Sequence, residues 1–139
     1  MSSYQFFASE KKLEEYRNPK IKIFQGKAEE NRLYSTADES VGLRIWEEEY
    51  REIISFYTKK PFCTHIEWEY GEKNALIIVQ YVKEHLQISP KIQLWDIWLG
   101  DKSQPITERV HISKFASDTV KRIWGKEYFE QAECLEVYR

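Results

Sequence analysis

Four side chains that could bind metal alternate along one stretch of the sequence: Cys63, His65, Glu67 and Glu69. Alternation places them on one face of an extended strand, with about 6.8 Å between neighbours. Thiolate, imidazole and carboxylate groups are the usual ligands of zinc. Cys63 and His65 could therefore share one metal ion, whereas the two ends of the run, about 20 Å apart, could not. A zinc site would need further ligands from another strand.

A second polar run lies in the segment Ile106–Ser113, where Arg109 and His111 share one face of a predicted strand. If this strand pairs with the strand that carries His65 and Glu67, the four side chains form a ligand-binding cluster on an open sheet face. The competing interpretation is a solvated face with cross-strand ion pairs, which are common. The sequence favours this second interpretation, because the spacing of the four residues matches no known metal motif.

Two further residues are candidates for chemistry. Asp96 lies in the apolar run Trp95–Trp98, and burial would raise its pKa towards that of a general acid. A hydrogen-bonded Asp at an accessible position explains the residue more simply. Cys134 could act as a nucleophile only beside a base, and it reads more simply as a small half-buried residue. No phosphate-binding glycine loop and no hydrolase or metalloprotease motif occurs, so we assign no catalytic residue and no cofactor.

Hydrophobic periodicity predicts the elements that position these residues. One helix is expected to bury Ala75, Leu76, Val79, Val82 and Leu86, and to end near an exposed His85. The predicted elements are a strand over Phe62–Tyr70, a helix over Glu72–Leu86, strands over Lys91–Leu99 and Ile106–Ser113, a helix over Asp118–Trp124 and a strand over Ala132–Tyr138.

This β-α-β-β-α-β order predicts an α+β fold with a ferredoxin-like half over residues 62–138. One observation disagrees, because Lys91–Leu99 is apolar on both faces and reads as an interior strand, whereas this topology makes it an edge. A β-rich N-terminal extension would resolve the conflict by enlarging the antiparallel sheet. Its predicted strands are Tyr4–Ala8, Ile21–Phe24 and Val41–Trp46, and the type of the element over 50–57 stays open.

Length and composition limit the classes of protein that fit. The 139 residues suit a single α+β domain spanning 1–139. A net charge of −2 without a basic block argues against nucleic acid as a partner. The sequence contains neither a membrane-spanning apolar run nor a signal peptide. With only two cysteines, we expect a cytoplasmic protein with both thiols reduced.

Several segments resemble a known group of proteins. They are Phe6 to Ser9, Tyr16 to Pro19, Ile66 to Tyr70, Leu94 to Gly100 and Ser113 to Gly125. Together they resemble small uncharacterised proteins of low-GC Gram-positive bacteria. The resemblance implies a cytoplasmic bacterial protein, and it supplies no activity and no catalytic residues.

Three functional hypotheses follow, in order of preference. The first is a non-enzymatic interaction or regulatory module that binds another protein or a second copy of itself, because aromatic residues make up 15% of the chain. The second is a small-ligand or metal-binding domain that uses His65, Glu67, Arg109 and His111, with Cys63 as a further metal ligand. The third is an enzyme that uses a buried Asp96.

Overall fold

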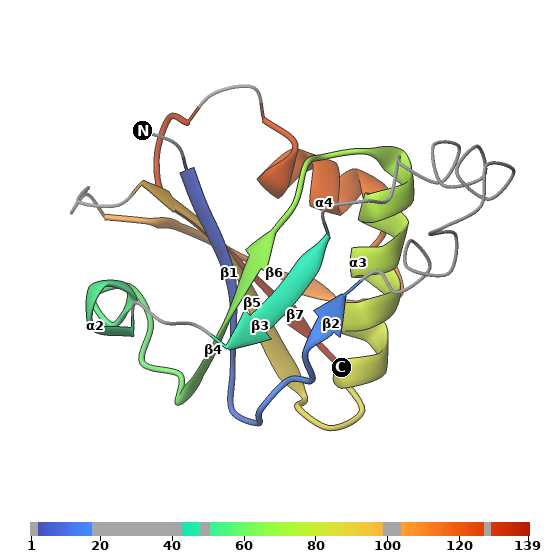
Figure 1. Ribbon diagram of the computed structural model, residues 1–139, viewed down its shortest axis with the longest axis horizontal. Coiled ribbons are helices and arrows are strands. Elements are labelled where there is room, and N and C mark those ends of the chain that lie inside the picture. The colour runs from blue at the N-terminus through green and yellow to red at the C-terminus, as the bar shows by residue number, and fades with distance from the viewer. Residues whose placement is uncertain (1–2, 18–42, 48–50, 99–103, 127–128) are drawn as a thin grey trace, which may run out of the picture.

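Seven strands form one sheet, and two longer helices pack on it (Figure 1). The computed structural model describes residues 3–17, 43–47, 51–98, 104–126 and 129–139. In chain order the elements are β1 (Ser3–Ser9), β2 (Tyr16–Arg17), β3 (Arg44–Glu47), α2 (Arg51–Ile54), β4 (Phe62–Glu67), α3 (Glu72–His85), β5 (Lys91–Trp98), β6 (Ile106–His111), the 3-10 helix η3 (Ile112–Lys114), α4 (Ser117–Trp124) and β7 (Glu133–Tyr138).

The strands lie in the order β2-β3-β4-β1-β5-β7-β6, and all neighbours are antiparallel except β6 and β7. β5 is an interior strand, paired with β1 on one side and β7 on the other. Its sequence explains this position, because Ile92 and Leu94 face one side of the sheet and Trp95 and Ile97 the other, all buried. The prediction of an interior strand here is confirmed.

The ferredoxin-like pairing predicted for residues 62–138 is not the observed one. That prediction set β4 beside β6 and β7 and left β5 at an edge. Instead, β4 pairs with β3 and β1, and β6 pairs with β7 at the end of the strand order. The reason is that β1 and β3, both N-terminal to residue 62, occupy the two sides of β4, so neither β6 nor β7 pairs with it. The coarser prediction, an α+β fold with a mostly antiparallel sheet, is confirmed.

Helices α3 and α4 contact each other and cover one face of the sheet, called here the helix face (Figure 1). Their buried residues recur at three- and four-residue spacing, as an amphipathic helix requires. Leu76 was predicted to be buried, but it is 57% exposed. It lies about 100° around the helix from Ala75, and Ile78 takes its place in the core. The main core side chains on this face are Phe7, Ile45, Ile66, Leu94, Leu135, Ile78, Val82, Val120 and Ile123.

The opposite face of the sheet is called here the open face. It carries a smaller core, which the segment 51–60 covers in part. Ile54 at the end of α2 is fully buried there, together with Phe6, Ala8 and Trp95. The type of the element over 50–57 was left open, and the structure makes Arg51–Ile54 helical. The short helix thus completes a second hydrophobic layer that the sequence pattern did not reveal.

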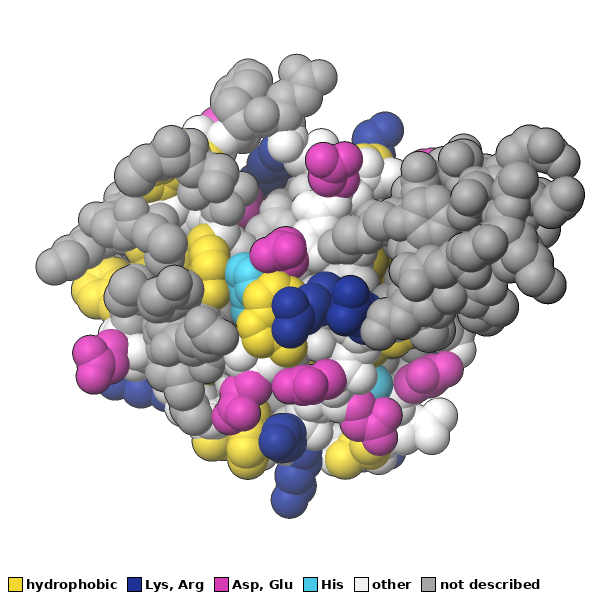
Figure 2. All heavy atoms as spheres, viewed as in Figure 1, with side chains coloured by type: hydrophobic (Ala, Val, Ile, Leu, Met, Phe, Trp, Pro, Cys, Tyr) yellow, Lys and Arg dark blue, Asp and Glu magenta, His cyan; other side chains and the backbone are white. Residues whose placement is uncertain are grey.

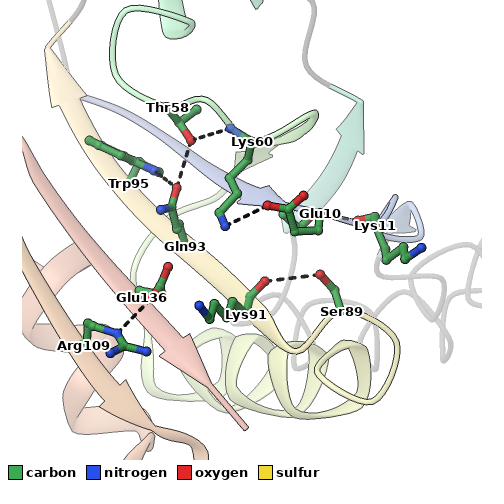
Figure 3. Close-up of polar contacts among 11 residues, drawn as sticks. Glu10, Lys11, Thr58, Lys60, Ser89, Lys91, Gln93, Trp95, Arg109 and Glu136 are labelled. Atoms are coloured by element: carbon green, nitrogen blue, oxygen red, sulfur yellow. Dashed lines mark hydrogen bonds and ion pairs between the residues drawn. The ribbon is translucent and has the colours of Figure 1, made fainter.

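Hydrogen bonds attach this covering segment to the sheet (Figure 3). The hydroxyl of Thr58 donates to Oε1 of Gln93 at 2.9 Å and accepts from the backbone N–H of Lys60 at 3.2 Å. The Trp95 indole N–H donates to the same Gln93 oxygen at 2.9 Å. The Lys60 ammonium donates to Glu10 at 3.0 Å. The segment is therefore fixed at several points rather than resting on apolar contact alone.

The N-terminal predictions can be checked only in part. β1 extends the strand predicted over Tyr4–Ala8, and β3 begins at Arg44 within the segment predicted as Val41–Trp46. The strand predicted over Ile21–Phe24 lies outside the described residues. In the described part of the chain, no helix is long and apolar enough to span a membrane.

Candidate functional site

The predicted cluster of His65, Glu67, Arg109 and His111 does not form. Both pairs lie on the open face. Arg109 is the cross-strand partner of Glu136, and Glu136 is the cross-strand partner of Gln93, which lies on this face. However, β1, β5 and β7 separate β4 from β6, so the two pairs lie about 19 Å apart at roughly 4.8 Å per strand. The prediction that they converge is wrong, because it depended on pairing β4 with β6.

Arg109 and His111 belong to a local surface group on β6 and β7. The Arg109 guanidinium donates to Glu136 at 2.9 Å and lies 4.6 Å from the centroid of the Tyr138 ring. The His111 ring packs edge-on against Tyr138, and its Nδ1 lies 2.8 Å from the hydroxyl oxygen of Ser113. Contacts of this kind are cross-strand pairing on a solvated face, worth about 1 kcal/mol or less each.

Cys63 and His65 lie on the same face of β4, as predicted for a metal pair. Cys63 is 6% exposed and His65 is half-buried. Among the described residues no group of three potential metal ligands is found. The described part of the chain therefore gives this pair no third ligand.

Cys134 is buried in the open-face core. Burial, together with the nearby Glu136 carboxylate, raises the pKa of its thiol to about 12. At neutral pH the group is a thiol and not the thiolate that attacks substrates. This environment is that of a small core residue, the simpler of the two interpretations of the sequence.

Asp96 is 3% exposed on the helix face of β5. Its cross-strand partners are Gln5 on β1 and Glu133 on β7, and Glu133 forms an ion pair with Lys126. Two cavities are lined by described residues alone, and neither has Asp96 in its lining. The accessible position favoured for this residue is wrong, and the buried alternative is the observed one. The pocket that an enzyme would need beside it is not one of these two cavities.

A cavity of about 450 Å³ opens at the end of the sheet where β1 begins, β4 ends and α4 ends, and we call it the aromatic cleft. It brings His65 and Glu67 together with side chains from separate parts of the chain. Five of its nine lining residues carry aromatic rings. The lining residues are Tyr4, Gln5, His65, Ile66, Glu67, Trp68, Tyr70, Trp124 and Lys126.

Hydrogen bonds fix the two tryptophan walls of the cleft. The Trp68 indole N–H donates to Oε1 of Gln5 at 2.6 Å, and Nε2 of Gln5 donates to the backbone oxygen of Trp124 at 3.4 Å. The Trp124 indole N–H donates to the backbone oxygen of Trp95 at 3.1 Å. Both indole donors are thus occupied within the protein. The walls are therefore organised before any ligand binds.

The rings meet at steep angles. The planes of Trp68 and Trp124 differ by 62° with centroids 6.0 Å apart, and those of Trp68 and Tyr70 differ by 68° at 5.8 Å. Edge-to-face contacts of this kind are favourable for aromatic pairs. They give the cleft the shape of a corner rather than a parallel slot.

The imidazole of His65 sits between two other rings. It stacks on Tyr4 with centroids 4.5 Å apart and meets Trp46 edge-on at 4.6 Å. The Arg44 guanidinium lies over the outer side of Trp46, 4.2 Å from the ring centroid. Figure 2 shows a histidine among hydrophobic side chains on the face that carries β3 and β4, next to basic side chains. Through its contacts with Tyr4 and Trp46, His65 thus forms part of the cleft wall.

The charged side chains at the cleft differ in whether they have a partner. Glu67 is exposed, and its carboxylate makes no hydrogen bond or ion pair with any described residue. Arg44 is its cross-strand partner, but the guanidinium lies over Trp46 instead. Lys126 is already paired with Glu133. Within the described part of the chain, the Glu67 carboxylate is therefore the charged group of the lining that has no ion-pair partner.

The Tyr70 hydroxyl adds a neutral polar group. Its oxygen is buried and has no hydrogen-bond partner among the described residues. Burial and the nearby Glu72 carboxylate raise the pKa of the phenol, so the proton stays in place at neutral pH. A ligand that reaches this hydroxyl would complete its hydrogen bonding.

Sequence reasoning identified two of the nine lining residues, His65 and Glu67. It assigned Trp68 and Tyr70 to the apolar side of a strand, although β4 ends at Glu67, before both of them. Aromatic residues that directly follow a strand and precede Gly71 are a signal that could have marked these two. No pattern in the sequence links them to Tyr4, Gln5 or the end of α4.

No protein-family model, curated protein or solved structure matches the chain. The functional argument therefore rests on the geometry of the aromatic cleft.

Proposed function

We propose that the protein binds a small organic ligand in the aromatic cleft. The supporting observation is a cavity of about 450 Å³ whose tryptophan walls are fixed by hydrogen bonds through Gln5 and the Trp95 carbonyl. Its volume falls within the range of about 300–1,000 Å³ that is typical of ligand sites. This is a revised form of the ligand-binding hypothesis, with His65 and Glu67 retained and Arg109 and His111 removed.

Binding is favoured over catalysis by the chemistry of the cleft. Asp96 and Cys134 lie outside its lining, and the Cys134 thiol is strongly disfavoured from ionising. His65 is held between Tyr4 and Trp46. A wall of aromatic rings held by hydrogen bonds suits recognition, where affinity comes from binding a ligand against a prepared site.

The test is a ligand panel observed by nitrogen–proton NMR of the tryptophan indoles. A bound ligand should shift the signals of Trp68 and Trp124 and leave that of Trp95, whose N–H bonds Gln93 on the open face, in place. Trp68→Ala should abolish the shifts. Phe56→Ala, at an aromatic residue 56% exposed and outside the cleft lining, serves as the matched control. If a chemically broad panel moves neither signal, the proposal fails.

The interaction-module hypothesis has one observation in its favour, the position of β6 at the end of the strand order. An edge strand can pair with a strand of another chain, so a partner protein or a second copy could add there. Four large hydrophobic side chains are exposed among the residues that the structure describes, and they do not gather on one element. They are Phe56, Leu76, Ile88 and Ile106.

A proline at the right register tests strand addition on β6. The N–H of Ile106 donates to Ala132, so Ile106 faces β7 and the N–H of Thr107 points outward. Thr107→Pro should therefore remove an outward donor and leave the β6–β7 ladder intact. Sedimentation should show a dimer that this variant loses. A wild-type chain that stays monomeric at high concentration would count against self-pairing.

The proposed setting is the cytoplasm of a low-GC Gram-positive bacterium. Cys63 and Cys134 are both free and buried, which is compatible with a reducing compartment. Fractionation of cells that express the full chain, with thiol labelling before and after unfolding, would test the compartment.

A further inference from the structure

We infer that the aromatic cleft recognises an organic cation of the methylated-ammonium class, a proposal that rests on ligand binding in the cleft. Two features carry it. Aromatic rings at steep angles to one another line the cavity, and a carboxylate without a partner among the described residues lies beside them. Each narrows the ligand class in a different way, the first by shape and the second by charge.

The shape argument starts from the angles between the rings. A flat ligand such as a nucleobase stacks best in a slot between parallel rings. The walls here stand at 62° and 68° to each other around Trp68, so no parallel slot forms between them. A rounded group needs no parallel slot, and several aromatic rings line this cavity. Aromatic cages that bind quaternary ammonium groups use the electrostatic attraction between a cation and such rings.

The charge argument concerns Glu67. Its carboxylate is exposed and unpaired within the described residues, next to Trp68 in the chain. An anionic ligand would need an uncompensated cation, but Lys126 is paired with Glu133 and the Arg44 guanidinium covers Trp46. The described lining carries one carboxylate, Glu67, and one ammonium, Lys126. Because the ammonium is already paired outside the lining, the carboxylate is the charge left to attract a ligand, and this favours a cation over an anion.

The size of the cavity indicates more than a head group. At about 450 Å³ it has room beyond a single trimethylammonium group. The Tyr70 hydroxyl, without a partner among the described residues, offers a neutral polar contact to the remainder. A cationic head with a short polar tail therefore matches the cleft.

The experiment compares choline with 3,3-dimethyl-1-butanol, which has the same shape without the charge. The full chain is titrated with each compound, and the indole signals of Trp68 and Trp124 are followed. We expect choline to bind with a Kd of roughly 1 mM and the alcohol about tenfold more weakly, since cation–π attraction and the carboxylate act only on the charged compound.

Variants separate the two contributions. Glu67→Gln should weaken choline about tenfold and leave the alcohol unchanged, because only the charge is removed. Glu14→Gln makes the same change at an exposed position near the opposite end of β1 and should alter neither titration. Trp68→Leu should abolish binding of choline. If this variant unfolds, Glu67→Gln still tests the inference, because that side chain has no described partner.

The outcomes distinguish this inference from the proposed function. Equal affinity for choline and the alcohol, or tighter binding of a neutral or anionic panel member, overturns the cation class and leaves ligand binding intact. If neither indole signal shifts with any compound, both the inference and the proposed function are overturned. A trimethyllysine peptide that binds more tightly than choline supports the inference and indicates a protein side chain as the source. If choline binds more tightly than the peptide, the inference is also supported, and a free small molecule is indicated as the source.

Discussion

The hydrogen bond between Gln5 and Trp68 joins β1 to the segment after β4 and holds one wall of the aromatic cleft. A double-mutant cycle with Gln5→Leu and Trp68→Phe measures its strength. Gln5→Leu leaves the indole N–H of Trp68 without its acceptor, and Trp68→Phe leaves the Gln5 oxygen without its donor. Each single change should lower the free energy of unfolding by about 1–2 kcal/mol, since an unpaired polar group in a half-buried site loses its desolvation compensation.

The double variant removes both partners and so avoids the unpaired group. Its loss should be smaller than the sum of the single losses by about 1 kcal/mol, the net value of a protein hydrogen bond. The bond from Gln5 to the Trp124 backbone is lost in both backgrounds and therefore cancels in the cycle. For a chain of 139 residues, this coupling corresponds to about 3–5 °C in Tm.

Urea unfolding followed by circular dichroism gives the four free energies. The titration of each variant with choline adds a functional measurement, because a Trp68 ring that is no longer fixed should bind less tightly. A coupling energy below about 0.3 kcal/mol would show that this bond does not hold the wall, and the claim of a prepared site would fall with it.

Three further predictions concern the frame around the site. Gly125→Ala should destabilise the protein by about 1–2 kcal/mol in urea unfolding, because the added Cβ would lie 2.7 Å from the backbone oxygen of Lys121; unchanged stability would mean that the end of α4 shifts freely. Burial raises the pKa of Cys134 to about 12, so the stability it contributes is full below the ordinary thiol pKa of 9.0 and declines as pH rises from there towards 12. Unfolding followed against pH should show this decline, and Cys134→Ala should flatten it. Thr58→Val, which is isosteric, should cost about 1 kcal/mol by removing the bonds to Gln93 and to the Lys60 backbone; proteolysis of the segment 51–60 should become faster, and an unchanged rate would contradict the attachment.

Local pattern predicted the elements of residues 62–138 to within a few positions. β5 illustrates why, because apolar residues on both faces require neighbours on both faces wherever the strand sits. The same rule indicated that the N-terminal extension adds a strand beside it, as β1 does. Strand pairing was not predictable in this way. A single sequence does not state which strands are neighbours, and the familiar β-α-β-β-α-β order suggested the wrong pairs.

The candidate site shows the same division. His65 and Glu67 were recognised from their alternation along one strand, and both line the cleft. Arg109 and His111 were assigned to them through the pairing of β4 with β6, and that pairing is absent from the observed sheet. His85 was expected on the surface, yet it is 5% exposed, and its Nε2 accepts a hydrogen bond from the backbone N–H of Glu14 at 3.3 Å. Contacts between distant segments decided all of these outcomes.

The central position of β1 has a consequence for how the chain folds. β1 is the earliest described strand, and its partner β5 follows about 90 residues later, so the middle of the sheet cannot close until most of the described chain has been made. Pairing of strands so far apart in the chain costs loop-closure entropy before the stabilising contacts between them form. We therefore expect folding on the millisecond-to-second scale of proteins rich in non-local pairs. During synthesis on the ribosome, the apolar residues of β1 stay exposed until β5 has been made. We therefore expect the nascent chain to bind chaperones.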